Sequence, residues 1–132
     1  MATVIDRARK TLTARGVAFD ADGTRIKVLA ADLAGFDVSL HALDSRKFIV
    51  RYEGWYETFS RAEDAYDCFE YGLSDSCRLR ITFRGARPVA WQIEKREYGV
   101  WTPGRIIRRR FVPFWRRARV ERRQNRVFVT TR

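Results

Sequence analysis

The segment from Ser60 to Leu73 constrains the fold most, because its start, its apolar face and its end can all be inferred from local chemistry. Ser60 and Glu63 have the spacing of a capping box, in which each side chain accepts a hydrogen bond from the other residue's backbone N–H at the start of a helix. Gly72 is of the residue type that commonly ends helices. The apolar residues between them recur at three- and four-residue steps on one stripe: Ala62, Ala65, Tyr66, Phe69 and Leu73. We therefore predict a helix over about residues 60–73, with its acidic side chains on a solvated face.

Segments in which polar and apolar residues alternate predict antiparallel strands on both sides of this helix. The clearest pattern covers residues 78–84, where one face is apolar and the other is almost entirely cationic. A turn at 85–88 leads into a partner strand at 89–96, in which Glu94 can form cross-strand pairs with those arginines. Further strands are predicted before the helix, at 38–42, 48–53 and 55–59.

The first 35 residues contain weaker signals. Val4, Ile5, Ala8 and Leu12 share one side of a short helix that Gly16 could end. Segments 17–19 and 25–29 then flank an Asp-Ala-Asp-Gly turn, which predicts a hairpin in which Gly23 takes a positive φ. A helix over residues 24–34 is the alternative interpretation of the same segment.

These elements predict an α+β fold: a mostly antiparallel, twisted sheet of about six to eight strands, with the 60–73 helix and the short N-terminal helix packed on one face. We expect the core to contain the apolar residues of the clearest strands and of the central helix, namely Phe48, Val50, Tyr52, Phe69, Leu79, Ile81, Phe83, Val89, Trp91 and Ile93.

The positive charge is concentrated at one end of the 132-residue chain, whose net charge is +11. Residues 105–132 contain eleven arginines and one acid, Glu121, and so carry +10, whereas residues 1–104 carry only +1. Within the first 104 residues, residues 53–76 carry seven acids and one arginine. We interpret residues 1–104 as a near-neutral α+β body and 105–132 as a basic C-terminal hairpin and tail of the same domain.

The basic segment also contains aromatic residues and proline. Thr102-Pro103-Gly104 has the composition of a turn, and Pro113 cannot donate to a strand ladder, so a strand here would be broken or at an edge. Residues 118–121 alternate and could form a last edge strand. Phe111, Phe114 and Trp115 are either core residues of this hairpin or exposed rings, and the sequence favours neither.

Catalytic and metal-binding patterns are weak in this chain. His41 is the one histidine, and together with Cys68 and Cys77 it forms neither a nucleophile set nor a zinc motif. We therefore expect a non-enzymatic protein without a cofactor. The two cysteines have no framework of further cysteines, so we expect reduced thiols. With no long apolar run or secretory signal, we expect a cytoplasmic location.

The composition of the basic segment favours binding to an anionic partner. Guanidinium groups pair in two-pronged fashion with phosphates, and aromatic rings stack on unpaired bases. We therefore expect a binding module for nucleic acid, either RNA or single-stranded DNA. The alternative is an assembly or adaptor domain that self-associates or docks an acidic protein surface, and a membrane surface is the least favoured partner. The predicted binding residues are Arg105, Arg108, Arg109, Arg110, Phe114, Trp115, Arg116, Arg117, Arg119, Arg122, Arg123 and Arg126.

Overall fold

The computed structural model describes residues 3–128, and within them the chain forms two helices and nine strands in two antiparallel sheets. The α+β class is therefore confirmed, with slightly more strands than expected and with the strands divided between two sheets. The first sheet contains β1 (Asp20–Ala21), β2 (Arg25–Val28), β3 (Val38–Asp44), β4 (Lys47–Tyr52) and β5 (Trp55–Phe59) in sequential order. The second contains β6 (Cys77–Arg84), β7 (Arg87–Glu97), β8 (Val100–Arg108) and β9 (Ala118–Gln124) in the order β8-β7-β6-β9.

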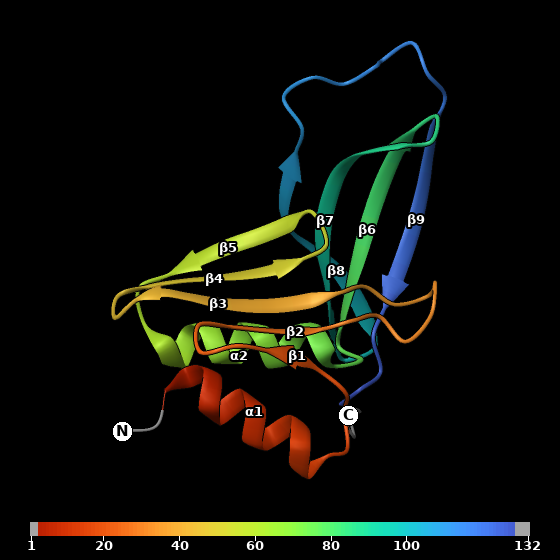
Figure 1. Cartoon of the computed structure of the whole chain (residues 1–132). Helices are drawn as coiled ribbons and strands as arrows, with labels where there is room; N and C mark the ends of the chain where they lie inside the picture. Colours follow the sequence, from red (N-terminus) through yellow and green to blue (C-terminus); the bar gives the residue numbers. More distant parts are fainter. Residues whose placement is uncertain (1–2, 129–132) are drawn as a thin grey trace.

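The helices cover one face of the five-stranded sheet. Helix α2 (Ala62–Leu73) packs against β3 and β4, and α1 (Val4–Ala14) packs beside it against α2, β2 and β3. The four-stranded sheet stands across the end of the first sheet (Figure 1). All ten residues predicted to form the core are buried. Trp55 joins the two sheets, because its indole Nε1 donates a hydrogen bond to the carbonyl oxygen of Arg105 at 3.1 Å.

The predicted face of α2 and its last residue are confirmed, but its predicted start at Ser60 and the role of Gly72 as its stop are wrong. Ala65, Tyr66, Phe69 and Leu73 are buried. The helix begins at Ala62 after Arg61, an N-cap residue without a side-chain cap hydrogen bond, so the capping box expected at Ser60 is not formed. Gly72 lies inside the helix, which ends at Leu73 and is followed by Ser74.

A capping box is present instead at the start of α1. The backbone N–H of Asp6 donates to Thr3 Oγ1 at 3.1 Å, and the backbone N–H of Thr3 donates to Asp6 Oδ2 at 3.2 Å. The backbone and side chain of Thr3 lower the pKa of Asp6 below its usual value. Ile5, Ala8 and Leu12 are buried on the side of α1 that faces the core, as predicted.

The hairpin predicted near residue 22 is confirmed, but its first strand is β1 at Asp20–Ala21 rather than residues 17–19, and the alternative helix over 24–34 is wrong. Strands β1 and β2 pair, with Ala21 opposite Ile26. Asp22 forms the turn by accepting hydrogen bonds from the backbone N–H groups of Thr24 and Arg25, at 2.8 and 2.9 Å. Gly23 is not among the residues with positive φ, because the Asp22 side chain organises the turn in its place.

The predicted terminal hairpin is wrong in its pairing. Residues 102–104 do not turn but lie within β8, where a register shift opposite Gln92 and Glu94 accommodates the extra residue. Pro103 is tolerated because β8 is an edge strand. The edge strand predicted at 118–121 is confirmed as part of β9, but β9 pairs with β6 and lies at the opposite edge of the sheet from β8. The predicted boundary at residue 104 therefore falls inside a strand.

Candidate functional site

The loop that connects β8 to β9, residues 109–117, lies at the end of the four-stranded sheet farthest from the helices (Figure 1). We call it the tip loop. It is held by backbone hydrogen bonds from Arg109 N–H to the Val89 carbonyl at 2.9 Å, and from Gly85 N–H to the Arg117 carbonyl at 3.0 Å. The Arg84 side chain also donates to the Arg116 carbonyl at 3.2 Å. The tip loop is therefore fixed against the β6–β7 turn.

Three aromatic side chains of the tip loop face solvent. The exposed fractions of Phe111, Phe114 and Trp115 are 69%, 78% and 63%. Trp115 meets both phenylalanines edge to face, with ring centroids 5.4 Å from Phe114 and 6.4 Å from Phe111. The interpretation of these rings as core residues is therefore wrong. Packing into the hydrophobic core does not explain why these three rings cluster in the tip loop.

The tip loop also carries arginines next to these rings in the sequence, and they have no carboxylate partner in the described part of the chain. Arg109, Arg110, Arg116 and Arg117 are all exposed, and none of them forms an ion pair with an acid within residues 3–128. The guanidinium carbon of Arg109 lies 5.5 Å from the centre of the Trp91 ring. The tip loop therefore presents cations and exposed rings together.

The remaining predicted binding residues fall into two groups. Arg105 pairs with Glu57 at 3.3 Å, Arg122 with Glu94 at 3.1 Å, and Arg119 and Arg123 both with Glu121. Hydrogen bonds from Arg123 and Arg119 lower the pKa of Glu121. Arg108 and Arg126 are exposed and form no ion pair within the described residues. Among residues 3–128, four arginines of the predicted set therefore form an ion pair with a carboxylate and six do not.

The structure adds arginines from outside the basic segment to this end of the molecule. Arg84 and Arg87 flank the β6–β7 turn, and a Cβ on Gly85 would lie 3.2 Å from Arg116 Cδ. The signal for Arg84 was present in the sequence as the cationic face of residues 78–84, whereas Arg87 lies in the predicted turn that follows. Local patterns could not show that β9 pairs with β6. They also could not show that the tip loop lies against the end of β6.

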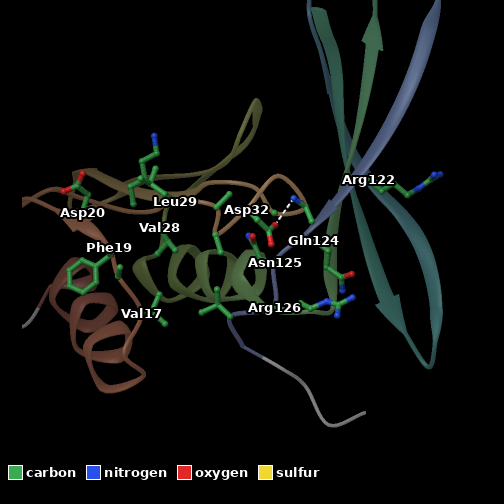
Figure 2. Close-up of a pocket in the computed structure, with 17 residues that line it drawn as sticks. Val17, Phe19, Asp20, Val28, Leu29, Asp32, Arg122, Gln124, Asn125 and Arg126 are labelled. Atoms are coloured by element: carbon green, nitrogen blue, oxygen red, sulfur yellow. Dashed lines mark hydrogen bonds between the residues drawn. The ribbon is translucent and has the colours of Figure 1, made fainter. Parts of the chain in front are cut away.

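A groove of about 920 Å³ lies elsewhere, between the end of β9 and the β1–β2 region (Figure 2). Its lining is mainly apolar and includes Val17, Phe19 and Leu29. Its charged lining residues are of both signs, Asp20 and Asp32 with Lys27, Arg122 and Arg126, and Figure 2 shows the Arg122 side chain directed away from the groove. The groove therefore has a mixed lining, unlike the cationic surface of the tip loop.

The described residues contain no group of three or more histidine, cysteine, aspartate or glutamate side chains that could hold a metal ion. Cys68 and Cys77 are free. Burial raises the pKa of the Cys68 thiol to about 12 and also raises that of Cys77, so neither is an activated nucleophile at neutral pH. No helix in the described range is long and apolar enough to cross a membrane.

Comparison of the chain with protein-family models, with curated proteins and with solved structures found no match.

Proposed function

We propose that this protein is a non-enzymatic module that binds single-stranded nucleic acid, either RNA or DNA, through its tip loop. The observation that carries the proposal is the exposed cluster of Phe111, Phe114 and Trp115 among four arginines that have no carboxylate partner within the described residues.

The two kinds of side chain support the proposal for different physical reasons. Stacking of an unpaired base on an aromatic ring contributes about 1–3 kcal/mol and requires no particular base. Guanidinium groups are weakly hydrated and bind phosphate oxygens through two parallel N–H groups. Duplex bases are already stacked on one another, so exposed rings of this kind favour a single strand.

A lipid surface suits the same tip loop less well. A planar membrane would touch the rings and the nearest arginines only, whereas further arginines, such as Arg108 and Arg122, lie on the strands behind the tip loop. A flexible polyanion can follow a cationic surface that extends away from the rings.

Self-association is the second candidate, and the acidic face of α2 favours it. Glu63, Asp64 and Asp67 are exposed on a part of the molecule remote from the tip loop, so two copies could meet with opposite charges. Light scattering over a range of protein concentrations tests this candidate, which requires a dimer whose population falls as salt is added.

Fluorescence anisotropy with labelled single-stranded RNA and DNA tests the proposed function. We expect micromolar or tighter binding at about 50 mM salt, weakening as salt rises. The double substitution Phe114→Ser and Trp115→Ser should weaken binding about ten-fold or more, because it removes two stacking rings without changing charge. Tyr98→Asn is the matched control: it removes a ring that is 98% exposed at the opposite end of the sheet, and asparagine tolerates the positive φ of 52° at this position.

Two results would overturn the proposal. One is the absence of micromolar binding by the unaltered protein at about 50 mM salt. The other is an equal loss of affinity in the tip-loop variant and in Tyr98→Asn, because binding would then not depend on the tip loop.

A further inference from the structure

The outer face of the four-stranded sheet, which points away from the core, carries arginines from all four strands. On β6, Leu79 and Ile81 are buried, so the intervening side chains lie on the opposite face. The strand register places Glu94 and Gln124 beside Arg78 on that face, and Arg122 and Gln92 beside Arg80. The arginines of this outer face are Arg78, Arg80 and Arg84 of β6, Arg96 of β7, Arg108 of β8 and Arg122 of β9.

Few acids balance these arginines. Glu94 is only 8% exposed, and one of its oxygens accepts hydrogen bonds from Arg78 Nε at 2.7 Å and from Arg122 Nε at 3.1 Å. Asp75 pairs with Arg96 at 3.2 Å at the end of the sheet nearest the helices. Within the described residues, no ion pair to a carboxylate is formed by Arg80, Arg84 or Arg108.

Arg80 is the least satisfied of these groups. It lies directly opposite Arg122 in the β6–β9 ladder, and like charges in that position destabilise a sheet. Its Nε atom is buried and has no hydrogen-bond partner among the described residues, and the same holds for Arg84 Nε. A buried donor without an acceptor is unfavourable in the free protein. The stability of the fold therefore does not explain this row of arginines.

The row leads from the tip loop toward the opposite end of the sheet. Arg84 donates to the Arg116 carbonyl of the tip loop, and alternate residues of β6 then place Arg80 and Arg78 on the same face. Alternate residues of a strand lie about 6.6 Å apart, which is the step from Arg78 to Arg80. Arg84 lies two such steps, about 13 Å, from Arg80, because Thr82 occupies the position between them. These spacings suit separate anions rather than a single one. At the far end, the guanidinium carbons of Arg78 and Arg96 lie 4.2 and 5.5 Å from the Trp101 ring centre.

We infer that the outer face is a phosphate-binding track continuous with the tip loop. A single strand that stacks its bases on Phe114 and Trp115 lays its backbone along Arg84, Arg80 and the Arg78–Arg122 pair, and its phosphates supply the negative charge that no carboxylate of the described residues supplies to Arg80 and Arg84. This inference rests on the proposed function and extends it to residues outside the basic C-terminal segment.

The double substitution Arg80→Gln and Arg84→Gln tests the track. For single strands, each lost phosphate contact lowers the slope of log affinity against log salt by about 0.7, so the variant should lose about 1.4 of slope together with affinity. Phe114→Ser with Trp115→Ser should lose affinity at an unchanged slope. Arg25→Gln with Arg46→Gln is the matched control, because it removes the same charge from exposed arginines of the five-stranded sheet and its turn.

Oligonucleotide length gives a second readout. We expect Arg80→Gln alone, which keeps the contact between Arg84 and the Arg116 carbonyl, to bind an oligonucleotide of about four nucleotides as the unaltered protein does, because so short a strand occupies the tip loop alone. One of about twelve nucleotides should bind several-fold more weakly to Arg80→Gln than to the unaltered protein. Because this substitution relieves like-charge repulsion with Arg122, the variant should fold, and its unfolding transition verifies this.

The outcomes separate the two proposals. If the tip-loop variant loses binding while Arg80→Gln with Arg84→Gln keeps the affinity and slope of the unaltered protein, the track is overturned and the proposed function stands. If the unaltered protein binds no oligonucleotide, both fail. If poly-glutamate binds as tightly as the twelve-nucleotide strand, and the Arg80→Gln and Arg84→Gln variant loses that binding, the outer face is a docking surface for acidic protein and the track is overturned.

Discussion

Gly72 shows how a single residue can serve packing rather than chain reversal. It lies in the last turn of α2, and a Cβ built on it would lie 2.3 Å from Cε1 of Tyr52. The Tyr52 ring is fully buried, stacks on Trp55 with ring centroids 4.7 Å apart and donates its hydroxyl hydrogen to the Cys68 carbonyl. The missing side chain of Gly72 therefore makes room for a ring that is held on several sides.

Gly72→Ala should lower the free energy of unfolding by about 1–2 kcal/mol. Overpacking a core costs about 1–3 kcal/mol, and alanine's better helix propensity offsets up to about 1 kcal/mol of that. Urea unfolding followed by circular dichroism measures the difference. Gly23→Ala, at an exposed turn with nothing within 4 Å of the added Cβ, should change stability by less than about 0.5 kcal/mol. Equal stability of Gly72→Ala and the unaltered protein would show that the Tyr52 ring is free to move.

The two capping patterns show what residue spacing can and cannot predict. Thr3 and Asp6 form the reciprocal hydrogen bonds of a capping box, whereas Ser60 and Glu63 have the better-known residue types and do not. The first residue of α2 follows an extended Arg61, with φ −117° and ψ 131°. Packing of the apolar face against the sheet stabilises a helix more than its cap does, so the face was predictable and the first turn was not.

The strands differ in how far the sequence predicts them. Clean alternation identified β6 and its buried face. Strand β6 lies inside the sheet between β7 and β9, and one of its faces packs against the core, so buried and solvated residues alternate along its whole length. For β8, the turn-like Pro103 and Gly104 concealed an edge strand that tolerates them. The contact between β6 and β9, such as Thr82 opposite Val120, joins segments far apart in the sequence. Composition could therefore predict the arginines and rings of the candidate site, but neither the exposure of the rings nor the juxtaposition of Arg80 and Arg122.

Helix α2 and strand β6 each contribute a buried thiol, and this gives the fold a pH dependence. Burial raises the pKa of Cys68 to about 12 and also raises that of Cys77. An unfolded thiol has a pKa of about 8.5, so above that pH the unfolded state loses protons that the folded state keeps. Each thiol's contribution to stability is therefore fully present below about pH 8.5 and is lost as the pH rises toward the folded-state value.

The free energy of unfolding should fall by about 1 kcal/mol per thiol between pH 8 and pH 9.5, and so by about 2 kcal/mol in all. Urea unfolding at the two pH values measures it, and this range stays below the usual tyrosine pKa of about 10. Cys68→Ala should remove about half of the decrease. An unchanged decrease in that variant would assign the pH dependence to other groups.

At the scale of the whole molecule, the basic segment is built into the fold rather than appended to it. Strands β8 and β9 form the two edges of the four-stranded sheet and enclose β6 and β7, which belong to the near-neutral first 104 residues. Most of the net charge of +11 is thus spread over one sheet and its tip loop, with the exposed acids of α2 elsewhere. Like charges held at such close spacing repel one another in the folded protein.

This arrangement predicts opposite effects of salt on the free protein and on its complex. Raising sodium chloride from about 20 mM to about 300 mM shortens the Debye length from roughly 20 Å to roughly 6 Å, which screens the repulsion among the sheet's arginines. The melting temperature of the free protein should therefore rise by a few degrees. Oligonucleotide affinity should fall, because releasing counterions into a more concentrated salt solution yields less free energy. Thermal unfolding with and without a single-stranded oligonucleotide measures both effects, and the stabilisation by the oligonucleotide should shrink over the same salt range.

The double variant Arg80→Gln with Arg84→Gln should show a smaller salt-dependent rise in melting temperature than the control Arg25→Gln with Arg46→Gln. A melting temperature of the free protein that falls with salt would mean that its ion pairs outweigh the repulsion, and the sheet would then need no external anion.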